Sequence, residues 1–174
     1  MKKIIPGLYV LISIAFCIYL VLPSRGFPDP LPGSVRSDEE GDNETSLRRA
    51  YFTNLQREEI INYYKKEFWY LPTLRLNYPP EDAQTLIRDQ TRSTFLEELV
   101  HPFRESFYIN GFKPIKAKDD IWYKGVHYVE KITVVYVPNS PIIRLLVIIP
   151  TQFFVWIVIA QFLKSIKEFR LKKI

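Results

Sequence analysis

The chain has few of the residues from which active sites are usually built. Among its 174 residues there is one cysteine, Cys17, and there are two histidines, His101 and His127. A single cysteine excludes an internal disulfide and a zinc site made of several thiolates. The six glycines form no phosphate-binding loop, and no Gly-x-Ser-x-Gly motif occurs. We therefore expect no cofactor and no catalytic centre.

Charge is absent from two long stretches, one near each end of the chain. Residues 4–22 and residues 145–163 are nineteen-residue runs without Asp, Glu, Lys or Arg. As helices they would extend about 28 Å, close to the hydrocarbon thickness of a bilayer. They are apolar on all sides, unlike a helix packed on a soluble core. We predict membrane-spanning helices at 4–22 and 142–163, the alternatives being a signal peptide and a buried core helix, respectively.

The distribution of charge predicts the orientation in the membrane. Residues 23–141 contain 16 Lys and Arg against 18 Asp and Glu, whereas the rest of the chain contains 8 against 1. Basic residues therefore mark both the N-terminus, residues 1–3, and the tail, residues 164–174, as cytoplasmic. We expect a two-pass protein of the cell membrane with its middle part outside the cytoplasm.

The distribution of charge also indicates which kinds of molecule the chain binds. The net charge of +5 comes from the ends of the chain, so it reports on topology and on attraction to anionic lipid rather than on nucleic acid. The expected partners are the lipid bilayer and a membrane protein, and the sequence gives no signal for an oligomeric state.

Between the two spans, composition separates a tether from a folded domain. Residues 23–46 are rich in Pro, Gly, Ser and acidic side chains, which cannot offset the entropy of ordering the chain, so we predict a flexible tether. Its acidic cluster lacks the ligand spacing of an EF-hand, and Asn43 begins a common glycosylation sequence. Residues 47–141 are predicted to form the extracytoplasmic domain.

The domain reads as a small α+β fold. Apolar residues recur at helical spacing over 47–69, which predicts one long helix. Residues 74–78 alternate as in a strand, and Pro79 and Pro80 open a short helix.

The second half of the domain is predicted to be mostly antiparallel sheet. Period-two patterns predict strands over 93–100 and 103–109, the second ending at a turn formed by Asn110 and Gly111. A hairpin closed by Lys124 and Gly125 leads into one long strand that ends at Val137.

Four polar residues in or beside the spans are candidates for contacts in the membrane. Gln152 lies at a depth between those of Ser13 and Cys17 in the antiparallel first span, so its amide could bond to either, or to a partner subunit. Arg144 stands so close to the apolar run that we expect it to reach the head groups or an acid on the domain. Only residues 138–141, two of them proline, join the long strand to the second span, which predicts a stiff connection.

Two classes of function fit these patterns. The favoured one is an interaction or assembly domain held at the membrane, in which His101 and His127 are half-exposed strand residues with structural roles. The alternative is a small envelope hydrolase or metal-dependent enzyme, which requires both histidines to meet Glu97 or Glu130. A ligand-sensing domain is a third option and requires an apolar pocket.

Overall fold

The computed structural model describes residues 4–24, 26–69, 72–88 and 92–171. It consists of two units. One contains the two terminal helices, and the other comprises residues 24–138.

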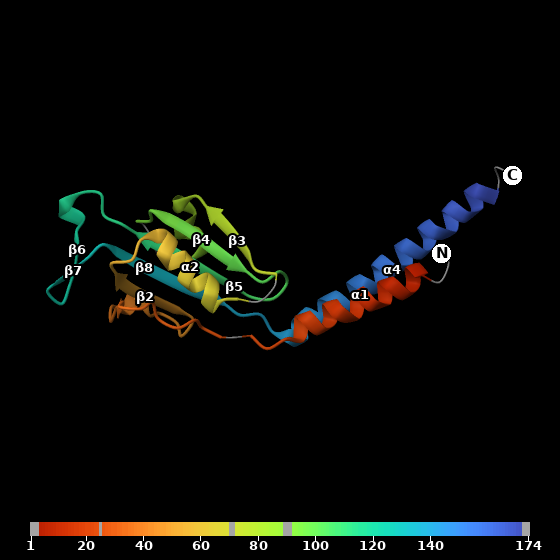
Figure 1. Cartoon of the computed structure of the whole chain (residues 1–174), viewed down its shortest axis with the longest axis horizontal. Coiled ribbons are helices and arrows are strands. Elements are labelled where there is room, and N and C mark those ends of the chain that lie inside the picture. Colours follow the sequence, from red (N-terminus) through yellow and green to blue (C-terminus); the bar gives the residue numbers. More distant parts are fainter. Residues whose placement is uncertain (1–3, 25, 70–71, 89–91, 172–174) are drawn as a thin grey trace. The chain divides into compact units, whose positions relative to one another are not determined.

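The helical unit contains α1 (Ile4–Val21) and α4 (Pro141–Leu171), which lie side by side (Figure 1). Both helices are long and apolar enough to cross a membrane, so the two apolar helices expected from the sequence are confirmed. α4 continues beyond the predicted end at residue 163 because Lys164 and Lys167, which follow, are good helix formers.

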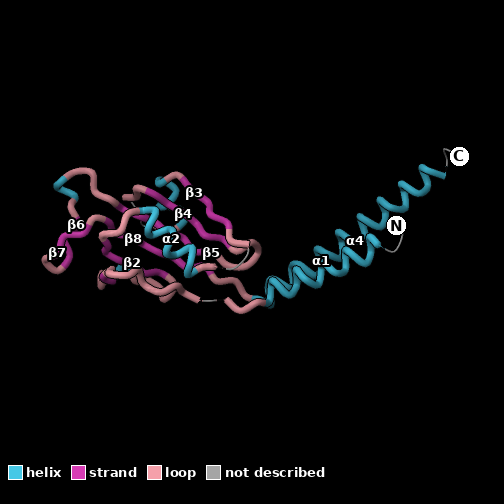
Figure 2. Tube along the Cα trace, viewed as in Figure 1, coloured by secondary structure: helices cyan, strands magenta, loops and turns pink. Residues whose placement is uncertain are grey.

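The other unit is built on an antiparallel sheet of six strands in the order β1-β2-β8-β5-β4-β3, with β6 and β7 as a separate hairpin (Figure 2). The strands are β1 (Val35–Arg36), β2 (Arg48–Thr53), β3 (Leu74–Tyr78), β4 (Phe95–Val100), β5 (Ser106–Phe112), β6 (Ile121–Tyr123), β7 (Val126–Tyr128) and β8 (Glu130–Val137). The short helices are η1 (Glu40–Asp42), η2 (Pro80–Asp82), α3 (Ala83–Leu86) and η3 (Ala117–Asp119).

The main core lies between the sheet and α2 (Arg57–Glu67), which crosses one face of the sheet (Figure 1). A capping box formed by Gln56 and Glu59 begins this helix by satisfying its first backbone N–H groups. Its buried side chains Ile60, Ile61 and Tyr64 pack on apolar residues of β4, β5 and β8. The opposite face of the sheet carries α3 and a smaller cluster. The α+β class is therefore correct.

The single long helix predicted over residues 47–69 is wrong. Residues 48–53 form β2, and the helix begins only at Arg57. Tyr51 packs under α2, whereas its neighbour Phe52 is buried in the cluster beneath the β6–β7 hairpin. Because consecutive strand residues point to opposite faces, a strand buries both rings, whereas the predicted helical stripe included only Tyr51.

The predicted turn at Asn110 and Gly111 is also wrong, because both residues lie within β5. Asn110 is buried and accepts a hydrogen bond from the hydroxyl of Ser93. A Cβ at position 111 would lie 2.0 Å from the ring of Phe95, so glycine is required there by a close approach rather than by a turn. In contrast, Lys124 and Gly125 close the hairpin as predicted, with φ of +50° and +78°.

Part of the predicted tether has more order than its composition indicated. Leu31 is buried in the main core, and β1 pairs with β2. Lys131 of β8 forms ion pairs with Glu39 and Asp42 of the same segment. These contacts hold the segment on the folded domain.

The two ends of the sheet have different roles. At one end, Ser24 donates a hydrogen bond to Glu105, and β8 finishes at Val137, so the domain begins and ends there. At the opposite end lie the start of β8, the end of β2 and the first turn of α2. The β6–β7 hairpin packs on Phe52 at this second end.

Candidate functional site

Two of the candidate residues in the spans, Ser13 and Gln152, lie along the contact between α1 and α4. A cavity of about 310 Å³ between these helices is lined by Ser13 and Gln152 together with apolar and aromatic side chains. The hydroxyl of Tyr9 donates a hydrogen bond to the backbone carbonyl of Gln152, and its ring lies 5.1 Å from that of Trp156. Cys17 is partly buried and is not among the lining residues of this cavity. Ser13 and Gln152 therefore line one cavity between the two helices.

Arg144 of α4 connects the two helices through a hydrogen bond near the end of α1. Its side chain is buried, and Nη1 donates a hydrogen bond of 3.0 Å to the carbonyl of Leu20 in the last turn of α1. Nη2 donates to the carbonyl of Asn139, just before α4 begins. The last carbonyls of a helix have no partner within the helix and carry its negative dipole end. Arg144 therefore caps α1, a role that the sequence did not indicate.

His101 occupies a buried structural position at the end of the sheet where the domain begins and ends. It is 1% exposed, and its ring stacks on Phe68 with centroids 4.0 Å apart. Nδ1 lies 2.8 Å from Oε1 of Glu105, and Nε2 lies 3.2 Å from the carbonyl of Phe68. The prediction that His101 is half-exposed is wrong, because the helix α2 and its C-terminal Phe68 cover this end of the sheet.

Glu105 is the acidic partner of His101. Burial alone would raise the pKa of the Glu105 carboxyl, but hydrogen bonds from His101 and Ser24 and the charge of Arg104 outweigh it and lower the pKa. The ionised carboxylate of Glu105 therefore stabilises the fold through these contacts.

His127 lies elsewhere in the domain, on the exposed side of β7. Its nearest acidic atom belongs to Asp120, 4.0 Å away, and its ring lies 5.2 Å from that of Trp122. Among the described ranges, no group of three His, Cys, Asp or Glu side chains is placed to hold a metal. The two histidines have separate partners, so the metal or hydrolase alternative gains no support from their placement.

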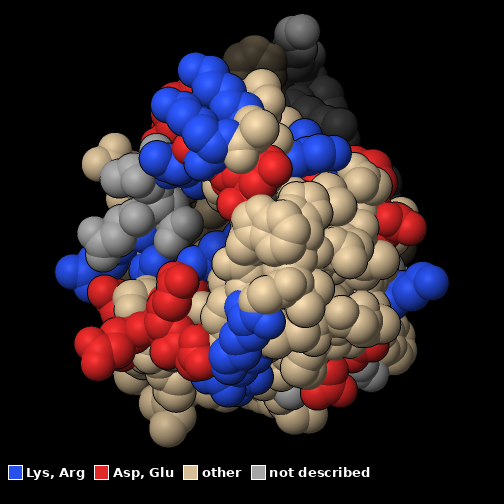
Figure 3. Space-filling model, turned by 90° about the vertical axis from the view of Figure 1, so that its left-hand side faces the viewer, with Lys and Arg blue, Asp and Glu red and all other residues tan. Residues whose placement is uncertain are grey.

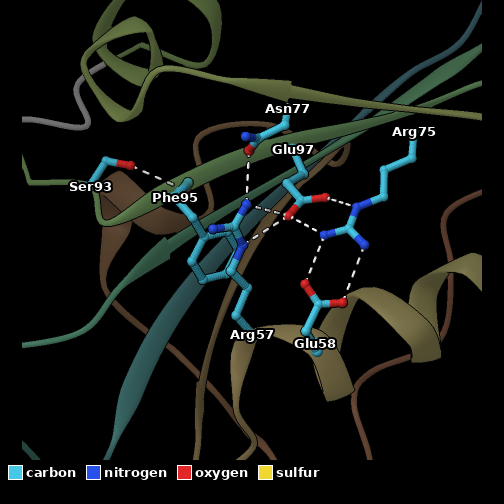
Figure 4. Close-up of polar contacts among 7 residues, drawn as sticks. All are labelled: Arg57, Glu58, Arg75, Asn77, Ser93, Phe95 and Glu97. Carbon is cyan, nitrogen blue, oxygen red and sulfur yellow. Dashed lines mark hydrogen bonds and ion pairs between the residues drawn. The ribbon is translucent and has the colours of Figure 1, made fainter.

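A network of charges ties α2 to the edge of the sheet, and the sequence did not indicate it (Figure 4). Glu97 of β4 is 0% exposed, and its Oε1 accepts hydrogen bonds of 2.7 Å from both Arg57 and Arg75. Arg75 also donates to its Oε2 and forms two bonds to Glu58, of 3.0 and 3.2 Å. Arg57 reaches Asn77 at 2.8 Å. Two arginines thus satisfy one buried carboxylate, and the network fixes the start of α2 against β3 and β4.

The β6–β7 hairpin presents the most distinctive surface of the domain. On its inner side Tyr123 stacks on Phe52 with centroids 4.3 Å apart. On its outer side Trp122 is 66% exposed and pairs with the exposed His127, whereas Val126 pairs with Tyr123. Figure 3, which views the domain from the hairpin end, shows a broad uncharged face bordered by separate groups of basic and acidic side chains.

No family model matches the chain, and no curated protein or solved structure is significantly similar to it.

Proposed function

We propose that the chain is a two-pass membrane protein whose domain lies outside the cytoplasm and binds another protein anchored in the same membrane. Two apolar helices and the concentration of basic residues at both ends of the chain support this topology. The β6–β7 hairpin is the proposed contact surface.

The observation that carries the proposal is the anchored but exposed hairpin. Its inner aromatic side chains are fixed on the sheet, so its outer face is presented with little loss of freedom on binding. The hairpin carries an exposed tryptophan, and Figure 3 shows a broad uncharged face with charged side chains at its border at this end of the domain. Exposed aromatic side chains and a low density of charge are typical of the centre of a protein interface.

The position of the hairpin within the domain supports the same conclusion. Residues 24 and 138, through which the domain continues into the rest of the chain, are at the opposite end of the sheet from the hairpin. A partner on the hairpin would therefore not compete with the connections to the helices.

Site-specific crosslinking in native membranes tests the proposal. A photo-reactive amino acid at position 122 should give an adduct with a second protein, whereas the same residue at position 69 should give none. Trp69 is the matched control because it is also a tryptophan and is 55% exposed. Equal adducts at both positions, no adduct at position 122, or an adduct containing only two copies of this chain would contradict the proposed partner.

A further inference from the structure

Two glutamates of the strands, Glu97 and Glu130, are buried on the face of the sheet that α2 covers, and they differ in their hydrogen-bond partners. Glu97 is satisfied by two arginines. Glu130, the first residue of β8, is 2% exposed, yet its Oε2 is buried and receives no hydrogen bond from any residue in the described ranges. A buried carboxylate oxygen without a donor destabilises the fold, because the desolvation of the group is not compensated. Glu97 shows that this fold can supply such donors, so Glu130 requires a separate explanation.

Glu130 lines a cavity at the end of the sheet where α2 begins. The cavity has a volume of about 440 Å³ and lies between the first turn of α2, the start of β4 and the segment after β5. This volume is within the range of about 300–1,000 Å³ that is usual for small-molecule sites. Its apolar wall consists of Phe95, Pro114 and Ile115. This end of the domain therefore has an open depression of ligand size with a partly apolar lining, in which Ile115 is 93% exposed.

Of the charged side chains that line the cavity, two are not used in ion pairs. Arg57 forms an ion pair with Glu97, and Glu58 forms an ion pair with Arg75. Lys113 donates to the neutral side-chain oxygen of Gln56 at 2.9 Å and forms no ion pair within the described residues. The cavity thus contains one carboxylate, Glu130, and one ammonium, Lys113, that form no ion pair among the described residues.

We propose that this cavity binds a small zwitterion with an apolar body, namely a free α-amino acid with an apolar side chain. Its ammonium group donates to Glu130, its carboxylate accepts from Lys113, and its side chain packs on Phe95, Pro114 and Ile115. The carboxylate also lies at the N-terminal end of α2, where the helix dipole favours negative charge.

The electrostatic environment of Glu130 agrees with this assignment. Burial raises the pKa of the Glu130 carboxyl above its usual value, although the charges of Lys113 and Arg57 act in the opposite direction. A ligand ammonium beside the Glu130 carboxylate would place an opposite charge close to this buried group and so favour its ionised form.

Calorimetric titration of the full chain in a mild detergent tests the proposal with three related probes. Leucine carries both charges, leucinamide lacks the carboxylate and resembles the N-terminus of a peptide, and 4-methylpentanoate lacks the ammonium. We expect saturable binding of leucine, with at least tenfold weaker binding of either of the other two. Equal binding of leucinamide would overturn the assignment in favour of a peptide N-terminus, and no saturable binding of leucine would overturn it entirely.

Three variants assign the binding to these residues. Glu130→Gln should abolish leucine binding while leaving the thermal unfolding midpoint equal or higher, because it removes an unsatisfied buried charge. Lys113→Met should weaken binding at least tenfold, and Lys116→Met, which changes an exposed lysine of the same loop outside the cavity lining, should leave it unchanged. Unaltered leucine binding in Glu130→Gln or in Lys113→Met would contradict the proposed site.

Discussion

Replacing Glu97 by Gln removes the charge at the centre of the network that holds α2 to the sheet. The carboxylate accepts four guanidinium hydrogen bonds, two from Arg57 and two from Arg75. Three of these bonds end on Oε1 and one on Oε2, so a glutamine with its oxygen at the Oε1 position turns its N–H₂ group toward Arg75, loses that bond and leaves the other three without a charged acceptor. Hydrogen bonds to charged groups contribute about 1.5–3 kcal/mol each. Because the arginine side chains are 39% and 34% exposed and can be hydrated, we expect a smaller total loss of about 2–4 kcal/mol.

The assay is urea unfolding of the full chain in a mild detergent, followed by near-ultraviolet circular dichroism of the domain. Arg75→Met should cost about 1–2 kcal/mol because Arg57 still neutralises Glu97. Changing both arginines to Met should cost about 3–5 kcal/mol, since it leaves a buried carboxylate without a counter-charge. The exposed pair of Arg92 and Asp119 provides the control, and Arg92→Met should change the free energy of unfolding by less than about 0.5 kcal/mol. A loss below about 0.5 kcal/mol for Glu97→Gln would refute the assigned role of the network.

Three further predictions concern single positions in the domain. Gly111→Ala should lower the free energy of unfolding by about 2 kcal/mol or more, because its Cβ would overlap the ring of Phe95; equal urea midpoints would contradict this. His101→Asn should lower the free energy of unfolding by about 1–3 kcal/mol, because the buried partners of His101 lose their hydrogen bonds. His127→Asn, at an exposed position, should change the free energy of unfolding by less than about 0.5 kcal/mol. A larger loss for His127→Asn than for His101→Asn would contradict these assignments. Because the pKa of the Glu105 carboxyl is lowered in the folded state, its stabilisation is complete above the unfolded pKa of 4.5 and is lost as the pH falls through the folded pKa. Glu105→Gln should therefore flatten the acid side of the plot of unfolding free energy against pH. An unchanged slope of that plot would refute this.

Much of the fold could be predicted because the relevant signals are local. The alternation at 74–78 and 93–100, the prolines before the short helices and the Lys124–Gly125 turn each specify one element through nearby residues. The two apolar helices are identified by length and composition alone. Errors arose where tertiary contacts decide the structure.

Two such errors have clear physical causes. An aromatic residue at position 51 fits a helical stripe and a strand equally well, and only the covering of both faces of β2 selects the strand. The pair Asn110 and Gly111 carries a turn signal, but the ring of Phe95, which pairs with Gly111 across the sheet, gives the glycine another reason to be there.

The candidate site could be predicted only in part. The sequence suggested that the Gln152 amide bonds to Ser13, to Cys17 or to a partner subunit, and the structure shows that Ser13 and Gln152 line the same cavity. It also named Glu130, but as a metal ligand beside the histidines. Its burial next to a cavity depends on where α2 begins relative to β8, which sequence spacing does not encode.

The topology is tested most directly by cysteine labelling in intact cells. In a Cys17→Ser background, a single cysteine replaces Gly41, where a Cβ meets no other atom within 4 Å, or Ser165, which follows the second apolar run. With a membrane-impermeant maleimide, Gly41→Cys should be labelled in intact cells and Ser165→Cys only after the membrane is permeabilised. Labelling of Ser165→Cys in intact cells, or protection of Gly41→Cys until permeabilisation, would contradict a domain that lies outside the cytoplasm between two membrane spans.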